Sequence, residues 1–343
     1  MKKHRILLLV NEALIPPDDL RGLSEDQIEA CRTEYNVLST LSNSGHEVRV
    51  LGIGDKIGEL RRVIRDWRPD ITFNLLEEFS GIPTYDHYVV TFLELMRQPY
   101  TGCNPRGMML SRDKVLTKQI LAYHRIPTPR FHVFPWGKSY REPRDLEFPL
   151  FVKSATDDAS LGISQASVVH DRERLRERVE FIQVQAQSDA LAEEYIEGRE
   201  LYVGVMGNER LTTLPVWELD FGKLPEAQAG IATRKVKWDP AYQRRHGIST
   251  GPARDLPDGA EKRITQLARR VFRALHMSGY ARMDLRMRPD GSIFVLEANA
   301  NPNLTYGEDF AESGHVAGID YPRLLNRIVQ LGLQYRAEWR MFE

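Results

Sequence analysis

The chain shows two different rhythms of hydrophobic and polar positions. In its first hundred residues, short apolar runs that are typical of strands alternate with stretches whose apolar residues recur at helical spacing. The expected strands are residues 5–10, 46–52 and 71–74, and the expected helices are residues 26–41, 57–67 and 86–96. This alternation predicts a parallel sheet with helices on its faces, and therefore an α/β fold.

The remainder of the chain mixes longer helices with more closely spaced strands. We expect helices at residues 112–124, 171–187, 260–276 and 321–331. We expect strands at residues 131–134, 150–154, 165–168, 190–196, 201–206, 210–214 and 216–219. Residues 221–259 are rich in glycine, proline and polar residues, which predicts a mobile or active-site loop segment.

Residues 281–303 combine two apolar stripes with charged positions in between. Residues of the two faces alternate from residue 282 to 287 and again from 294 to 299, on either side of the sequence Arg288-Pro289-Asp290-Gly291. Proline in the second place and glycine in the fourth is the composition of a type I turn. Period-two alternation on both sides of a turn predicts an antiparallel hairpin with one buried face.

The polar face of this hairpin carries Arg282, Asp284, Glu297 and Asn299. If the turn closes as expected, Arg282 lies opposite Glu297, at the ~5 Å separation of directly opposed side chains. Asp284 then lies opposite Val295. One interpretation is a solvated strand face with a cross-strand Arg–Glu pair. The asparagine-rich loop at residues 299–303 favours a metal site instead, because carboxylates and amide oxygens are hard ligands suited to Mg²⁺ shared with phosphates.

Length and composition limit the classes of function. A chain of 343 residues exceeds one simple core, so we expect two or three domains. The 47 Lys and Arg residues balance 48 Asp and Glu residues, which argues against a nucleic acid or a membrane surface as the partner. The apolar run near the start is too short for a signal peptide, and the two cysteines indicate free thiols in a reducing compartment. We therefore expect a cytoplasmic protein.

Four further stretches carry residues that suit a nucleoside triphosphate. Lys114 follows Asp113 at an expected helix start, although lysines are common there. Lys153 ends an apolar strand, and a buried lysine needs a partner such as a phosphate. The small-residue loop 154–164 has amides that can fold over phosphates. Residues 192–200 form either a strand whose carboxylates meet an adenosine or an amphipathic edge strand.

In this order and spacing, the stretches resemble the ATP-grasp superfamily, and within it the D-alanine–D-alanine ligases. The similar stretches are residues 93–102, 111–121, 148–164, 191–201, 236–238 and 281–305. The last is the most specific, because its arginine, aspartate, glutamate and asparagine follow the family's spacing. The resemblance implies an ATP-grasp fold of three α/β domains, at residues 1–108, 109–196 and 197–343, with ATP between the central and C-terminal domains.

For the nucleotide, ATP, the resemblance implies two groups of residues. Those expected at the phosphates are Lys114, Lys153 and, in the loop that covers them, Ser160 and Gly162. Those expected at the nucleoside are Glu193, Tyr195 and Ile196 around adenine, and Glu200 at the ribose.

For the metal and the chemistry, the resemblance implies a third group. The expected ligands of two Mg²⁺ ions, or of Mn²⁺, are Asp284, Glu297 and Asn299. Lys237 would approach the γ-phosphate, and Arg282 together with a backbone N–H near Asn303 would stabilise a tetrahedral intermediate. The implied reaction is ATP-driven ligation of a small-molecule carboxylate to an amine through an acyl phosphate, with release of ADP and phosphate.

The sequence departs from the D-alanine–D-alanine ligases on the acceptor side. Residues 75–88 lack the family's glycine-rich His-Gly…Gly-Glu-Asp-Gly loop, and Asn303 stands in a glycine's place. Glu308, followed by Asp309, replaces a serine that would meet a substrate carboxylate. We therefore expect amino acids or small peptides as substrates, but not two D-alanines.

Three alternatives stay open at this point. The first is an ATP-grasp ligase that modifies a peptide or a natural product. The second is a non-catalytic nucleotide-binding regulator, which the retained metal trio and Arg282 disfavour. The third is a nicotinamide-dependent dehydrogenase, which is disfavoured because no GxGxxG follows residues 5–10. A homodimer is compatible with the resemblance.

Overall fold

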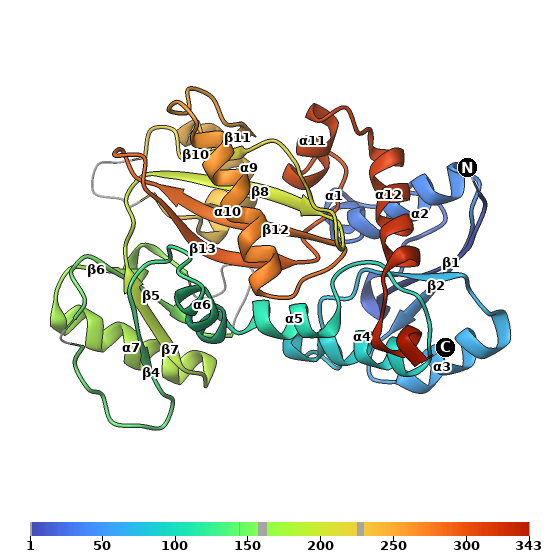
Figure 1. Ribbon diagram of the computed structural model, residues 1–343, viewed down its shortest axis with the longest axis horizontal. Coiled ribbons are helices and arrows are strands. Elements are labelled where there is room, and N and C mark those ends of the chain that lie inside the picture. The colour runs from blue at the N-terminus through green and yellow to red at the C-terminus, as the bar shows by residue number, and fades with distance from the viewer. Residues whose placement is uncertain (1, 144, 157–162, 225–229, 343) are drawn as a thin grey trace.

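The computed structural model describes residues 2–143, 145–156, 163–224 and 230–342, and these contain three β-sheets in succession along the chain. In Figure 1 the first sheet lies to the right in blue, the second lies at the lower left in green, and the third lies above and between them in yellow to orange. Helices cover each sheet, which confirms the α/β class. The three domain boundaries stay a prediction.

The first sheet is parallel and buried on both faces. Its central strand β1 (Arg5–Asn11) lies between β2 (Glu47–Ile53) and β3 (Ile71–Asn74), in the predicted parallel arrangement. One face of β1 packs against two helices, α2 (Arg32–Asn43) and α12 (Tyr321–Gln334). The other face packs against α3 (Ile57–Trp67) and α4 (Asp86–Leu95). The C-terminal helix α12 therefore completes the core of the N-terminal sheet (Figure 1).

The helix expected at residues 26–41 is in fact two helices. The first, α1 (Glu25–Ala30), begins at Ser24 with a capping box to Gln27, and the chain turns at Cys31 before α2. None of the α1 side chains is buried, whereas α2 is anchored in the core by residues such as Val37 and Leu41. The core therefore does not anchor α1 as it anchors α2, and α1 lies beside the cleft described below. Two short 3-10 turns, η1 (Glu12–Leu14) and η2 (Pro83–Tyr85), complete this region.

The second sheet is antiparallel, with the strand order β4-β7-β5-β6. Its strands are β4 (Phe131–Phe134), β5 (Leu150–Ser154), β6 (Val168–Val169) and β7 (Ala190–Glu194). The helix α7 (Arg172–Ala186) covers one face through Leu175, Val179 and Ile182. The prediction of a strand at residues 165–168 is wrong. Ser164 and Ser167 cap each other, and the chain between them forms a 3-10 turn, η3 (Gln165–Ser167).

Two helices, rather than the expected one at residues 112–124, lead into this sheet. They are α5 (Pro105–Arg112) and α6 (Lys114–Tyr123). Asp113 separates them, because its extended backbone ends α5 and its side chain accepts a hydrogen bond from the Leu116 N–H at the start of α6. The cap places Lys114 at the first position of a helix.

The third sheet carries most of the polar residues singled out above. Its strand order is β11-β10-β8-β12-β13, with β9 paired to β8. The strands are β8 (Arg199–Met206), β9 (Thr212–Thr213), β10 (Trp217–Asp220), β11 (Ser249–Pro252), β12 (Tyr280–Met287) and β13 (Ile293–Ala300). The helix α10 (Ala260–Ala274) packs its apolar side onto one face of the sheet, and the opposite face is left to the cleft and to α11 (Asp309–Val316).

The segment 221–259, expected to be loop, contains regular structure. Outside residues 225–229 it forms α8 (Arg234–Trp238), α9 (Pro240–His246) and β11. Thr233 and Asp239 each cap the following short helix with a side-chain oxygen. The helices were missed because each spans only one or two turns, too few to show a helical period. The chain ends in η4 (Glu338–Phe342).

Candidate active site

A cleft of about 1020 Å³ lies between the second and third sheets and reaches the N-terminal region at α1. Every candidate residue that the structure describes lines it: Lys114, Lys153, Glu193, Tyr195, Ile196, Glu200, Lys237, Arg282, Asp284, Glu297, Asn299 and Asn303. Ser160 and Gly162 lie outside the described residues. Residues from strands far apart in the sequence therefore meet in one cavity.

The hairpin β12–β13 forms, but its predicted register is wrong. Asp284 lies opposite Glu297, and Arg282 lies opposite Asn299. Two one-residue shifts cause the difference. Gly291, in the left-handed region at φ +81°, makes Arg288 pair with Ser292, and a bulge follows Asp284.

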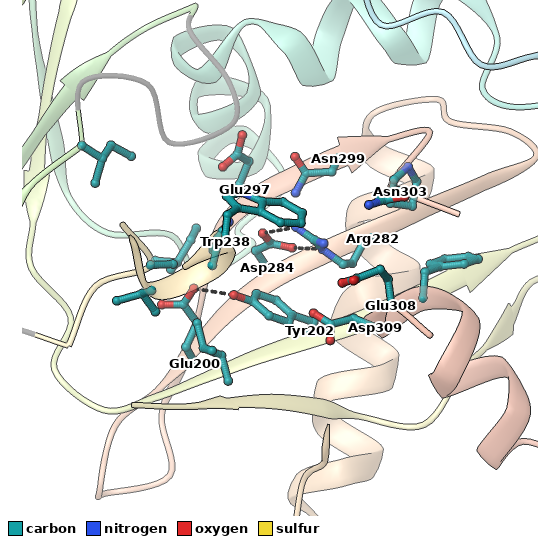
Figure 2. A pocket seen from close by; sticks show the side chains of 18 of the residues that line it. Glu200, Tyr202, Trp238, Arg282, Asp284, Glu297, Asn299, Asn303, Glu308 and Asp309 are labelled. Atoms are coloured by element: carbon teal, nitrogen blue, oxygen red, sulfur yellow. Dashed lines mark hydrogen bonds and ion pairs between the residues drawn. The ribbon is translucent and has the colours of Figure 1, made fainter. Parts of the chain in front are cut away.

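The two shifts in the hairpin register add up to two residues. Since one residue of slip moves a side chain to the other face of a strand, a slip of two restores it. The polar residues therefore share a face as expected, and Asp284 and Glu297 occupy directly opposed positions on the two strands. Figure 2 shows both at the centre of the cleft, with Asn299 beyond Glu297.

Three lysines and two carboxylates cluster at the side of the cleft next to α6, with Lys118 buried behind the residues that line it. Lys153 Nζ lies 2.8 Å from Glu193 Oε1, and Lys118 Nζ lies 2.5 Å from Glu193 Oε2. Lys114 Nζ lies 3.3 Å from Glu297 Oε1. Burial by itself would raise the pKa of Glu297, but Lys114, Lys153 and Lys237 outweigh it and lower the pKa to about 2. Glu297 is therefore ionised at neutral pH.

The sequence did not reveal Lys118 as part of this cluster. Its side chain is only 1% exposed, and it also donates to Thr128 Oγ1 at 2.9 Å. Burial lowers its pKa, and Glu193 partly offsets that effect. The available signal was its position four residues after Lys114, which places both lysines on one side of α6.

A chain of four side chains runs along β8 and β12 on the floor of the cleft. Arg282 makes a bidentate contact to Asp284, with N–O distances of 2.8 and 2.9 Å, and its guanidinium lies 4.7 Å from the centre of the Tyr202 ring. Tyr202 donates from its hydroxyl to Glu200 Oε1 at 2.8 Å, and Arg286 donates to Glu200 Oε2 at 2.5 Å. Figure 2 shows the first three members of the chain and the paired Asp284.

Arg286 was not selected from the sequence, although it follows Arg282 and Asp284 on the same face of β12. Its side chain is 3% exposed, and besides Glu200 it donates to two backbone carbonyls, Ile196 O at 3.2 Å and Gly230 O at 2.5 Å. Tyr195 donates from its hydroxyl to the same Gly230 carbonyl at 3.1 Å. Arg286 therefore joins the residues expected at the nucleoside to the segment that leads into α8 and Lys237.

The opposite end of the cleft is acidic. Glu308 and Asp309 lie at the start of α11, and Glu25, Asp26 and Glu29 of α1 line the same cavity. Asp309 Oδ1 accepts from Trp217 Nε1 at 3.0 Å, and the carboxylate of Glu308 lies 3.9 Å from Arg32. The α1 carboxylates gave no signal in the sequence, since acidic residues in a first helical turn are common.

The carboxylates at these opposed positions fit a divalent metal ion bound together with phosphates. Asp284, Glu297 and Asn299 offer hard oxygen ligands from adjacent strands, and the buried Asn299 Nδ2 has no partner among the described residues. Within those residues, no group of three or more His, Cys, Asp or Glu side chains could hold a metal ion. Phosphate oxygens would have to complete the ligand shell.

Comparison with known proteins agrees with this geometry. The family model described as "D-ala D-ala ligase C-terminus" matches residues 121–330, which include both sheets around the cleft. The chain belongs to the D-alanine–D-alanine ligase family. This membership makes it an ATP-dependent ligase of the class that forms C–N bonds, acting on a carboxylate and an amine.

Relatives of this ligase extend over nearly its whole length. An uncharacterized protein, y4sG, from Sinorhizobium fredii is 34% identical over 88% of this chain and 87% of its own length. A D-alanine–D-alanine ligase from Pelotomaculum thermopropionicum is 29% identical over 91% of this chain and 95% of its own.

Solved structures confirm the ATP-grasp fold of this ligase. The D-alanine–D-alanine ligase of Bacillus anthracis, solved in complex with ATP, superimposes with a TM-score of 0.74 at 22% identity, covering 96% of this chain and 98% of that one. Among the described residues, no helix is both long enough and apolar enough to cross a membrane.

Proposed function

We propose that this ligase joins an amino acid or small peptide to an amine through an acyl phosphate, using MgATP and releasing ADP and phosphate. The observation that carries the proposal is the cleft itself, where Lys114, Lys153 and Lys237 surround Glu297, which lies opposite Asp284 and beside Arg282. The reaction needs cations for a triphosphate, oxygen ligands for Mg²⁺ and a donor for an oxyanion. All three sets of groups line one cavity.

In the first step, a substrate carboxylate oxygen attacks the γ-phosphorus and ADP leaves. Two anions must meet, and two unit charges at ~4 Å repel each other by about 4 kcal/mol at an effective dielectric constant near 20. Lys114, Lys153 and Lys237 offset this repulsion and hold the phosphates in line. Mg²⁺, when bound by Asp284, Glu297 and Asn299, adds charge neutralisation at the phosphates.

In the second step, the amine attacks the activated carbonyl, phosphate leaves and the nitrogen loses a proton. Negative charge develops on the carbonyl oxygen of the tetrahedral intermediate. Arg282 uses Nε and Nη2 for Asp284, and its Nη1 has no partner among the described residues, so that nitrogen remains available as a donor. Burial would lower the pKa of Arg282, but Asp284 outweighs it and raises the pKa, so the guanidinium stays charged.

At the acceptor end, the acidic residues favour a cation over a carboxylate. Glu308 and Asp309 lie together, and the negative charge of Asp309 adds to burial in raising the pKa of Glu308. A substrate carboxylate placed here would be repelled. We therefore expect an amine substrate that presents positive charge to this end, and not D-alanine as the acceptor.

A hydroxamate screen tests the proposed function without knowledge of the amine. The purified protein is incubated with ATP, Mg²⁺, hydroxylamine and single D- or L-amino acids or dipeptides, because hydroxylamine traps any acyl phosphate. We expect carboxylate-dependent hydroxamate together with ADP. The variant Glu297→Gln should lose this product and bind MgATP more weakly by calorimetry. The absence of hydroxamate with every carboxylate, despite MgATP binding, would reject the ligase proposal and favour a nucleotide-binding regulator.

A further inference from the structure

The side chain of Asn303 has a fixed orientation at the edge of the cleft. Its Oδ1 accepts from the backbone N–H of Thr305 at 2.8 Å. A backbone N–H can only donate, so the atom that it contacts must be the amide oxygen and not the nitrogen. The hydroxyls of Thr305 and Thr33 approach the same oxygen, at 2.6 and 3.3 Å. A flip of the Asn303 carboxamide would place its NH₂ group against the Thr305 N–H, so this backbone contact fixes the orientation of the side chain.

The amide nitrogen of Asn303 consequently points away from the two threonines. Among the described residues, no group accepts a hydrogen bond from Nδ2, although Oδ1 is contacted by three donors. Asn303 lines the cleft on the loop after β13, and Figure 2 places it beyond Arg282 as seen from Asp284. The NH₂ group of this half-buried amide is therefore available to donate a hydrogen bond to a molecule bound in the cleft.

We propose that Nδ2 of Asn303 donates a hydrogen bond to an oxygen of the reacting carboxylate, as the bound anion or as the oxyanion of the tetrahedral intermediate. This inference rests on the proposed ligase function. Arg282 supplies a charged donor to the same cavity, and the side chain of Asn303 supplies a neutral one from the neighbouring loop. Two preorganised donors on a developing oxyanion stabilise it more than one does.

Because Asn303 also shapes its own loop through Thr305, a purely structural role must be distinguished from contact with substrate. Asn303→Asp does so, because a carboxylate keeps the oxygen that accepts from Thr305 and Thr33 but replaces the NH₂ group with a negatively charged oxygen. Asn303→Gly removes the donor without adding charge. If Asn303 contacts the substrate, activity should decrease from the wild type to Asn303→Gly and further to Asn303→Asp. If its role is purely structural, Asn303→Asp should be as active as the wild type, and Asn303→Gly should be the least active variant.

The hairpin turn offers a matched control. Asp290 Oδ1 accepts from Ser292 N at 2.8 Å and from Ser292 Oγ at 2.6 Å, the same pair of contacts that Thr305 makes to Asn303. Asp290 does not line the cleft. The variant Asp290→Asn makes the reverse exchange of amide and carboxylate in an equivalent turn, and we expect its kcat and KM to match those of the wild type.

The experiment measures kcat and KM for the carboxylate that the screen identifies, with hydroxylamine as the amine, in the wild type and the three variants. We expect Asn303→Asp to lower kcat/KM by about 10²–10³-fold, the range seen on loss of one oxyanion donor. A fall in kcat assigns the contact to the oxyanion, and a rise in KM alone assigns it to the bound carboxylate. Asn303→Asp with wild-type kinetics would overturn the inference and leave the ligase function intact. An inactive wild type would overturn both.

Discussion

Arg282 divides its donors between protein and cavity. Two of its nitrogens are held by Asp284, and the ring of Tyr202 lies beneath the guanidinium plane. A side chain fixed in this way has little freedom to lose when a ligand oxygen arrives, so a contact of Arg282 with a transition state, as proposed above, would be preorganised. Removal of the guanidinium would leave Asp284 without its bidentate partner.

At the residue scale, we expect Arg282→Ala to lower kcat by about 10²–10³-fold. Most of the effect should fall on kcat, because the developing oxyanion interacts with Arg282 more strongly than the ground state does. Steady-state kinetics with the carboxylate from the screen measure the loss, and calorimetry checks that MgATP still binds. Turnover near the wild-type rate would exclude Arg282 from the chemistry.

Some of the site residues could be predicted from the sequence and others could not. Arg282, Asp284, Glu297 and Asn299 were found because period-two alternation and a turn are local features of the chain. Lys118 and Arg286 were missed because the partners of a buried charge lie on distant elements. Glu193 is 75 residues from Lys118, and Glu200 is 86 residues from Arg286. A charged residue in an apolar pattern is visible in the sequence, but its counter-ion is not.

At the element scale, the crossing from the second sheet to the third depends on Gly198. Its backbone lies at φ +144°, and a Cβ built there would come within 2.1 Å of the Met287 carbonyl at the end of β12. The segment that leads into β8 can approach the end of β12 this closely only because position 198 has no side chain. The approach brings Ile196 and Glu200 to Arg286.

We expect Gly198→Ala to destabilise the protein by about 1–3 kcal/mol, the usual cost of a non-glycine residue in a strained conformation. Thermal unfolding followed by circular dichroism measures the shift of Tm. Gly58→Ala in α3 is the control, since a Cβ there meets nothing within 4 Å. Equal melting temperatures for both variants would contradict the strain argument.

Element boundaries were predicted well where one element carries a complete pattern. The strand at residues 71–74 and the helix at residues 57–67 match β3 and α3 at both ends. The predictions failed where a single side chain overrides the pattern, as at Asp113 between α5 and α6. They also failed where an element is too short for a period, as in α8 and α9. The predicted register of the hairpin was wrong because the turn is one residue longer than expected and because the bulge could not be seen in the alternation.

At the scale of the whole molecule, the two ends of the chain share a core. The helix α12 packs on the first sheet, and His46 Nε2 lies 2.9 Å from Asn326 Oδ1 at this contact. Both side chains are buried, with relative exposures of 7% and 5%. The alternating pattern predicted an α/β N-terminal unit, but it did not show that residues beyond 320 complete this unit, because a non-local contact leaves no local pattern.

We expect Asn326→Leu to lower the free energy of unfolding by about 1–3 kcal/mol, the cost of leaving a buried polar group such as the His46 ring without its partner. Urea denaturation measures the change. The control, Arg323→Ala on the same helix, breaks only an exposed ion pair with Asp320 and should cost at most about 1 kcal/mol. A loss no larger than that of the control would show that the contact contributes little.

The chain of side chains from Arg282 through Tyr202 and Glu200 to Arg286 has an evolutionary consequence. Through direct contacts between neighbouring side chains, it connects the place where the new bond would form with the place where the nucleoside would bind. A lineage that changed its nucleoside preference by altering Glu200 would disturb the support of the guanidinium at the other end. A change in nucleoside preference would therefore impair the positioning of Arg282, and the residues of the two places should change together or not at all.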